Sequence, residues 1–185
     1  MTCASDQPLP EFAVLTGRKV ALRPFGPDDV TAAYLGWLND PEVVRYSNQR
    51  FRRHDSASSA AYLASFAGTD HLFLSIRRLA DGAAVGTMTA YRSRHHGTVD
   101  VGIMVGDRGT WGQGIGQDAW NTLSDWLLGP GRMRKLTCGT LACNRPMRAI
   151  AERSGMVLEA VRRDQEIVDG VLQDMLYFAR FRSDP

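Results

Sequence analysis

The segment VDVGIMVGDRGTWGQGIGQDAW, residues 99–120, decides the fold that we expect for this chain. It begins with an apolar, β-rich run, passes through a turn with glycines at 112, 114 and 116, and continues into a helical pattern. Glycines free backbone N–H groups, and the first turn of a helix carries partial positive charge, so such a turn binds anions without a basic side chain. The segment therefore predicts a phosphate or pyrophosphate site between a strand and a helix.

The spacing within this turn separates the known phosphate-binding motifs. A Walker A loop requires Lys and then Ser or Thr after its last glycine, but Ile115 and Gly116 follow Gly114. The dinucleotide motif G-x-G-x-x-A matches Gly114, Gly116 and Ala119, but it also needs an acidic residue about 20 positions further on. Because residues 126–151 contain no Asp or Glu, a nicotinamide site is not expected.

On both sides of this segment, strand-like and helix-like patterns alternate. Strands are expected at residues 18–25, 71–79, 84–92, 98–106, 135–142, 156–168 and 171–181. Helices are expected from Pro27, from Asp55 or Ser56, from Gly114 and from Pro146. On the second helix, the expected buried face is Ala60, Leu63 and Ala64. We expect one mixed α/β domain over residues 18–185, with about seven strands and four helices, behind a flexible lead-in at residues 1–17.

The composition excludes several classes of partner. The 185 residues include 22 Lys and Arg against 20 Asp and Glu, without the basic clusters of nucleic-acid binders. The three cysteines form no C-x-x-C pair and the four histidines are isolated or lie in a turn, so neither a disulfide framework nor a metal site is expected. The N-terminus has no targeting pattern and no apolar run reaches the roughly 18 residues of a membrane span. We therefore expect a cytoplasmic protein that binds neither nucleic acid nor membrane.

Three ordered motifs resemble the GNAT superfamily of acetyl-CoA-dependent N-acetyltransferases. They are WLNDPEVVRY at 37–46, WGQGIG at 111–116 and NRPMRAIAERSGM at 144–156. The resemblance covers roughly residues 18–182 and is strongest to the branch of ribosomal-protein α-amino and nucleotide-sugar N-acetyltransferases. It implies a GNAT-like fold, in which a central, mixed but mostly antiparallel sheet is flanked by helices.

The resemblance also implies where acetyl-CoA binds as cosubstrate. The pantetheine arm would pair with the backbone of Met104, Val105 and Gly106, because its amides can extend an open strand. The pyrophosphate would lie on the turn formed by Trp111, Gly112, Gln113, Gly114, Ile115, Gly116 and Gln117. Trp111 stands where the family usually has Arg or Gln, which matters little to a site made by backbone groups. Asn144 and Arg148, one helical turn apart, resemble family contacts to pantetheine and phosphate, and Asn144 can also cap its helix.

Acetyl transfer to an amine requires a neutral nucleophile and a place for the charge that develops on the carbonyl oxygen. Asp100 lies 14 residues before Gly114, where many related enzymes carry a Glu as general base. Glu159 follows Asn144 by 15 residues and matches the base proposed in the ribosomal-protein branch. For each carboxylate, an ordinary hydrogen-bonded or solvated residue on a strand is the alternative interpretation.

Neither side-chain acid of the related branches is present at its expected position. Met147 and Ala151 stand where those branches carry Ser or Tyr to protonate the CoA thiolate. The thiolate would then leave with help from solvent, backbone groups or another residue such as Tyr177. A catalytically weak CoA-binding regulatory module is therefore the alternative to an active enzyme.

The acceptor is expected to be a primary amine. By resemblance, the segment with Tyr46, Arg50, Phe51 and Arg52 borders its channel, with an ordinary surface loop as the alternative. The α-amine of a peptide or ribosomal protein is preferred over an aminosugar nucleotide or another small amine. The exposed strand edges of such a fold also allow a homodimer, and the sequence leaves open whether another acyl-CoA is used.

Overall fold

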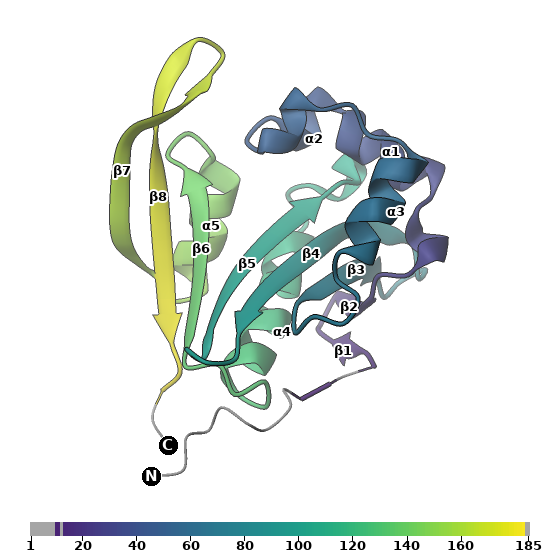
Figure 1. Ribbon diagram of the computed structural model, residues 1–185, viewed down its shortest axis with the longest axis horizontal. Helices are drawn as coiled ribbons and strands as arrows, with labels where there is room; N and C mark the ends of the chain where they lie inside the picture. The colour runs from purple at the N-terminus through teal and green to yellow at the C-terminus, as the bar shows by residue number, and fades with distance from the viewer. Residues whose placement is uncertain (1–9, 12, 184–185) are drawn as a thin grey trace.

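The computed structural model describes residues 10–11 and 13–183, which form an eight-stranded sheet with helices on both faces (Figure 1). The strands are β1 Leu15–Thr16, β2 Val20–Pro24, β3 Leu72–Arg78, β4 Ala84–Ser93, β5 Thr98–Val105, β6 Lys135–Leu141, β7 Val157–Val168 and β8 Val171–Phe181. The α-helices are α1 Ala32–Asn39, α2 Pro41–Val44, α3 Ser56–Ala64, α4 Ile115–Leu128 and α5 Arg145–Arg153. Short 3-10 turns cover Pro27–Asp29, Asn48–Phe51 and Arg108–Thr110.

The expected mixed α/β fold is confirmed. The sheet order is β1-β2-β3-β4-β5-β6-β8-β7, and every neighbouring pair is antiparallel except β5 and β6. Among the described residues the strands and helices exceed the expected numbers by one each. The two-residue strand β1 lies inside the stretch expected as a lead-in, of which residues 1–9 and 12 are outside the described residues.

Two apolar clusters hold the helices on the sheet. One joins the inner face of α4 to strands β2 to β6, with Ala119, Trp120, Leu123 and Leu127 fully buried. The other lies on the opposite face, where Tyr34 of α1 packs against Phe25 and Phe25 stacks on Phe73. Burial of these large side chains is the main favourable term for the fold. It also fixes the position of the α4 N-terminus against β5.

The expected helix from Pro27 to Leu38 is broken after its first turn. Asp29 is buried and accepts hydrogen bonds from the guanidinium groups of Arg23 and Arg77. Since a buried carboxylate needs such partners, Asp29 is held in a 3-10 turn, and Thr31 caps a new helix by accepting the N–H of Tyr34.

The apolar face expected on α3 is only partly buried. Ala60 and Ala64 are exposed, whereas Ser59 is buried and Leu63 is half-buried. The helix is rotated because the larger apolar groups Leu63 and Phe66 pack against the aromatic cluster, and their burial contributes more than that of alanine methyl groups.

The strand β7 forms one edge of the sheet, and most of its side chains are exposed. The homodimer that such an edge allows stays a prediction. Within the described residues, no helix is long and apolar enough to cross a bilayer.

Candidate functional site

The strands β5 and β6 separate along their length and create an opening in the middle of the sheet. They pair only from Thr98 to Asp100 on β5 and from Lys135 to Thr137 on β6. In the part of the chain that the structure describes, the edge of β5 from Val101 to Val105 therefore has no strand partner on this side. Figure 1 shows β5 and β6 diverging toward the end of the sheet that carries α2. Unpaired strand edges offer backbone groups to an extended ligand.

A cavity of about 970 Å³ occupies this opening. One wall comes from the C-terminal halves of β5 and β6, the glycine turn and the start of α5, while the opposite wall comes from α1, α2, the segment before α3 and α3 itself. Of the residues expected to bind cosubstrate or acceptor, the lining includes Tyr46, Met104, Val105, Trp111, Gly112, Gly114, Ile115, Gly116, Gln117 and Asn144. Gly106, Gln113, Arg148, Arg50, Phe51, Asp100 and Glu159 lie outside the lining.

The glycine turn has the geometry of an anion site. Gly112 and Gly114 adopt left-handed backbone conformations, with φ of 75° and 79°, which other residues rarely adopt. Gly114 is the N-cap of α4 and has no side chain with which to cap it, so the first N–H groups of the helix face the cavity end without a side-chain acceptor. An added Cβ at Gly116 would lie 3.2 Å from side chains of Val105 and Ile150, so helix and strand approach closely there.

The turn is anchored by two residues that the sequence patterns did not indicate. The carboxylate of Asp118 accepts the backbone N–H groups of Arg18, Lys19 and Val20 at 3.1, 2.8 and 3.1 Å. The Nζ of Lys19 then donates to the backbone oxygen of Gln113 at 2.6 Å. These contacts fix the first turn of α4 against the start of β2. They join residues nearly 100 positions apart, which no local pattern reveals.

The other residues predicted to contact the cosubstrate differ in where their side chains lie. Asn144 caps α5 by accepting the N–H of Met147 at 3.3 Å, and it also lines the cavity. Arg148 instead donates to the backbone oxygen of Ala142 at 3.1 Å. The amide nitrogen of Gln117 donates to the Ser154 hydroxyl at 2.7 Å, so its side chain connects α4 to α5.

The end of β5 is shaped by two tryptophans. The indole N–H of Trp111 donates to the backbone oxygen of Val105 at 2.8 Å and thereby fixes the side chain over the unpaired strand edge. An added Cβ at Gly106 would lie 2.2 Å from the Trp37 ring, so only glycine fits at this position. The backbone N–H of Gly106 donates to the backbone oxygen of Val85. This N–H therefore faces β4 rather than the cavity.

Asp100 lies where the two strands begin to separate, because it is the last residue of β5 that pairs with β6. Its carboxylate accepts the Thr137 hydroxyl at 2.9 Å. Although the side chain reaches solvent, burial by the surrounding protein raises the pKa of Asp100, and the hydrogen bond from Thr137 opposes this change in part. A carboxylate with a raised pKa is a better proton acceptor.

Glu159 is engaged elsewhere. Its carboxylate forms an ion pair with Lys135 Nζ at 2.5 Å, at the start of β6 and outside the cavity lining. Cys138, by contrast, does line the cavity, and burial raises the pKa of its thiol to about 12, so it stays uncharged near neutral pH.

The predicted acceptor residues divide into two groups. Tyr46 lines the cavity, but Arg50 forms an ion pair with Glu166 at 3.4 Å and donates to the backbone oxygen of Ile167. Phe51 is 71% exposed and packs under the Arg50 guanidinium. Arg50 therefore connects the segment after α2 to the β7–β8 hairpin, across the cavity.

A second contact strengthens this connection. Arg45 Nη2 pairs with Asp169 Oδ2 at 2.8 Å at the tip of the hairpin. The residues that do line the cavity after Phe51 are Arg52, Arg53 and His54. Arg52 belongs to the segment that the resemblance places at the acceptor channel, whereas Arg53 and His54 were not predicted there. The polar run that contains all three was the available signal.

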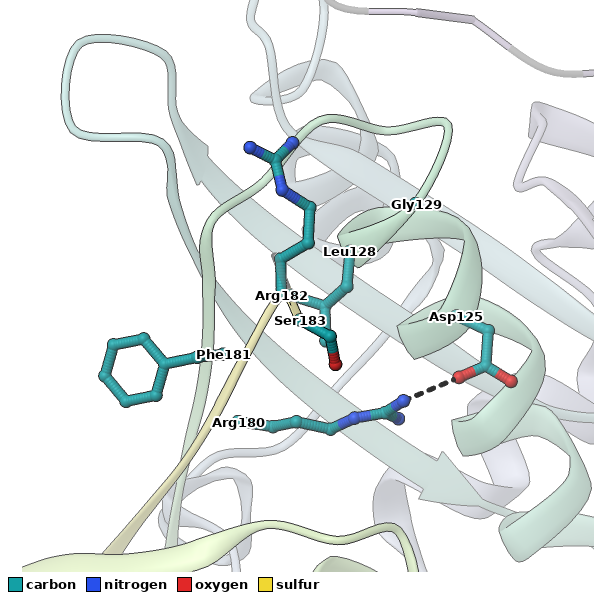
Figure 2. A pocket seen from close by; sticks show the side chains of 7 residues that line it. All are labelled: Asp125, Leu128, Gly129, Arg180, Phe181, Arg182 and Ser183. Carbon is teal, nitrogen blue, oxygen red and sulfur yellow. Dashed lines mark hydrogen bonds and ion pairs between the residues drawn. The ribbon is translucent and has the colours of Figure 1, made fainter. Parts of the chain in front are cut away.

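A second hollow of about 560 Å³ lies at the opposite end of α4 (Figure 2). Its lining includes Leu128, Gly129 and Arg182, and Arg180 forms an ion pair with Asp125 at 3.1 Å. The C-terminal end of a helix carries partial negative charge, so this hollow lacks the features that favour an anionic ligand at the glycine turn. Among the described residues, no group of His, Cys, Asp and Glu is arranged to hold a metal ion.

Comparisons with known proteins agree with this geometry. Residues 19–157, well over half of the chain, match the family described as acetyltransferase (GNAT) domain. No curated protein sequence matches the chain with statistical significance.

Several solved structures share the fold at low sequence identity. The ribosomal-protein-S5-alanine acetyltransferase from Vibrio fischeri is 15% identical, with a TM-score of 0.78 over 94% of this chain and 98% of that chain. The ribosomal L7/L12 α-N-protein acetyltransferase RimL, solved with coenzyme A, is 15% identical, with a TM-score of 0.78 over 91% and 97%. The microcin C7 self-immunity acetyltransferase MccE, solved with acetyl-CoA and AMP, is 19% identical, with a TM-score of 0.75 over 89% and 93%.

Proposed function

Because this chain belongs to the GNAT family of acetyltransferases, we propose that it transfers the acetyl group of acetyl-CoA directly to a primary amine while both substrates are bound. The observation that carries the proposal is the single cavity that joins the N-terminus of α4, the unpaired edge of β5 and the polar segment before α3. A cavity with two differently built walls can hold a cosubstrate and an acceptor side by side. Holding two reactants in this way supplies much of the acceleration of a group transfer.

The wall that contains the glycine turn suits acetyl-CoA. The pyrophosphate would accept the free N–H groups at the start of α4, where the helix dipole favours negative charge. The pantetheine arm would lie along the open edge of β5 between Val101 and Val105, beside Asn144. A pantetheine amide at the end of β5 would have to replace or accommodate the Trp111 hydrogen bond to Val105.

The chemistry requires the amine nitrogen to attack the thioester carbonyl, a C–N bond to form and the C–S bond to break. The amine loses a proton, and the departing thiolate takes one up. Asp100 is the better placed of the two predicted bases, since it lies at the point where β5 and β6 separate and its pKa is raised, whereas Glu159 is paired with Lys135. A water molecule would have to relay the proton, because Asp100 lies outside the cavity lining.

An α-amine is the preferred acceptor. Its ordinary pKa of about 7.7 to 8.0 leaves part of it neutral at physiological pH, whereas a lysine side chain, near 10.4, depends more on a strong base. Two of the similar structures are acetyltransferases of ribosomal proteins. An aminosugar nucleotide or another small amine is the alternative acceptor.

The test is an acceptor panel with acetyl-CoA. Peptides with a free α-amine, the same peptides blocked at the α-amine but carrying lysine, aminosugar nucleotides and polyamines would be incubated separately with the enzyme. Thiol release and the mass increase of one acetyl group on the acceptor are the two readouts. We expect acceptor-dependent release to be fastest with free α-amines. Tight acetyl-CoA binding without release for any amine would instead identify a CoA-binding regulatory module.

A further inference from the structure

We propose that the acceptor carries an anionic group, a carboxylate or a phosphate, close to its amine, and that Arg52 and Arg53 bind this group at the acceptor end of the cavity. The inference rests on the proposed function, because it names the class of acceptor that the same site takes. It concerns the wall opposite the glycine turn, where the segment between the turn Asn48–Phe51 and α3 lines the cavity.

Charge is distributed unevenly over the lining. Among the described residues that line the cavity, Glu42 is the only acidic side chain, against Arg45, Arg52, Arg53 and Arg153. A cavity wall with this excess of positive charge attracts anionic ligands and repels simple polycations.

Among the described residues, Arg52 and Arg53 differ from the other arginines on this side of the cavity in having no partner, and Arg153 on the α5 wall has none either. Arg45 pairs with Asp169, Arg50 with Glu166 and Arg108 with Asp40. Arg52 and Arg53 form no ion pair or side-chain hydrogen bond with any other residue that the structure describes. Guanidinium groups bind carboxylates and phosphates through paired hydrogen bonds, so these two are free to recognise such a group.

Two buried polar atoms on the same wall also have no partner. Ser59 is 3% exposed, and its hydroxyl forms no hydrogen bond with the described residues. The buried Nε2 atom of His54 also forms no hydrogen bond with them. Both residues line the cavity. Buried polar groups are nearly always hydrogen-bonded, so these atoms indicate a partner that arrives with a ligand or with ordered water. They are an observation independent of the arginines, and they belong to the same wall of the cavity.

The segment that carries these groups is held in position by α1. The side chain of Asn39 accepts the backbone N–H of His54 at 2.9 Å and donates to its backbone oxygen at 2.8 Å. Asp55 then caps α3 by accepting the N–H of Ser58 at 2.7 Å. A backbone fixed on both sides reduces the entropy lost when a ligand binds. Arg52 and Arg53 thus extend from a preformed backbone.

The first experiment compares acceptors that differ only in the anionic group. One matched pair is a peptide with alanine first and aspartate second against the same peptide with asparagine second. The other is an aminosugar phosphate against the free aminosugar, which separates phosphate from carboxylate recognition. We expect kcat/KM to be about tenfold or more higher for the anionic member of at least one pair, as for other close charge pairs. Equal kcat/KM within both pairs would overturn the proposal.

Substitutions test whether Arg52 and Arg53 bind the anionic group of the acceptor. In the double variant Arg52→Gln, Arg53→Gln, the ratio of kcat/KM between the anionic and the neutral member of a pair should fall to about one. Arg163→Gln is the matched control, because Arg163 is an 82% exposed arginine on β7, outside the cavity lining. A preference that persists in the double variant would place recognition elsewhere and contradict the proposal.

Ser59→Ala separates a binding role from a structural one. Removing a hydroxyl that has no partner should leave Tm unchanged or raise it, since an unsatisfied buried group is unfavourable to folding. If the hydroxyl contacts the acceptor, KM for the acceptor should nevertheless rise. A lower Tm with an unchanged acceptor KM would show that Ser59 only packs.

A binding measurement keeps the failure of this inference distinct from failure of the proposed function. Calorimetric titration of the CoA-loaded protein with the acidic and neutral peptides needs no turnover. Tighter binding of the acidic peptide, lost in the double variant, supports the anionic subsite even if no amine is acetylated. The aminosugar phosphate and the free aminosugar are titrated in the same way, and equal binding within both pairs overturns the inference even if every amine is acetylated.

Discussion

At the scale of single residues, the structure distinguishes two carboxylates that the sequence motifs made equal candidates. Asp100→Asn should lower kcat by about tenfold to a hundredfold, the lower range for loss of a general base, with little change in KM for acetyl-CoA. Glu159→Gln should leave kcat nearly unchanged and cost at most about 1 kcal/mol of stability through the Lys135 ion pair. Steady-state kinetics with a peptide acceptor measures both. Unchanged turnover in both variants would exclude a side-chain base at either position.

The raised pKa of Asp100 also predicts a pH-dependent stability. The folded protein keeps this carboxyl protonated at pH values where the unfolded chain, with an ordinary pKa near 3.9, has released the proton. Asp100 therefore contributes less to stability as pH rises through the interval between these two pKa values. The Tm of Asp100→Asn minus the Tm of the wild-type protein should therefore be larger at about pH 7 than at about pH 4. A Tm difference that is the same at both pH values would contradict this.

At the scale of elements, the glycine turn before α4 can be tested with a matched pair of substitutions. Gly112 and Gly68 have φ of 75° and 70°, and an added Cβ would meet no atom within 4 Å at either position. Gly112→Ala and Gly68→Ala should each destabilise the fold by about 1 to 2 kcal/mol through left-handed strain. Only Gly112→Ala should raise KM for acetyl-CoA, because only Gly112 lines the cavity. An equal effect of both on KM would mean that the turn does not bind the cosubstrate.

At the scale of the whole molecule, the cavity is bridged by contacts between the segment after α2 and the β7–β8 hairpin. If Arg50 acts through its ion pair with Glu166, then Arg50→Gln and Glu166→Gln should raise KM for the acceptor by a similar factor, about two- to fivefold. The double variant should be no worse than Arg50→Gln, since Arg50→Gln already removes the ion pair and also the hydrogen bond to Ile167. If Arg50 acted only by contacting the acceptor directly, Glu166→Gln would leave KM for the acceptor unchanged. Acceptor titrations of the four proteins decide between these outcomes.

Local sequence signals determined much of the fold. Asp81-Gly82 and Asp169-Gly170 predict the two hairpin turns, and Asp169 and Gly170 adopt φ of 51° and 78° in the structure. Asp55 and Gly114 likewise mark the starts of α3 and α4. Each of these signals acts through backbone geometry or a hydrogen bond within a few residues, so it can be predicted from neighbouring positions in the chain.

Only the tertiary structure decided which side chains reach the cavity. The spacing to Gly114 and Asn144 selected Asp100 and Glu159 as bases, but both lie outside the lining, while Arg53 and His54, which no motif indicated, lie within it. Burial of apolar groups positions α3, and the ion pairs of buried Asp29 with Arg23 and Arg77 break the helix after Pro27. Both choices depend on strands outside these helices. The sequence alone thus determined a glycine turn suited to phosphate at the start of a helix. The opposite wall, and with it the choice of acceptor, depends on contacts between segments more than 100 residues apart, which local patterns do not encode.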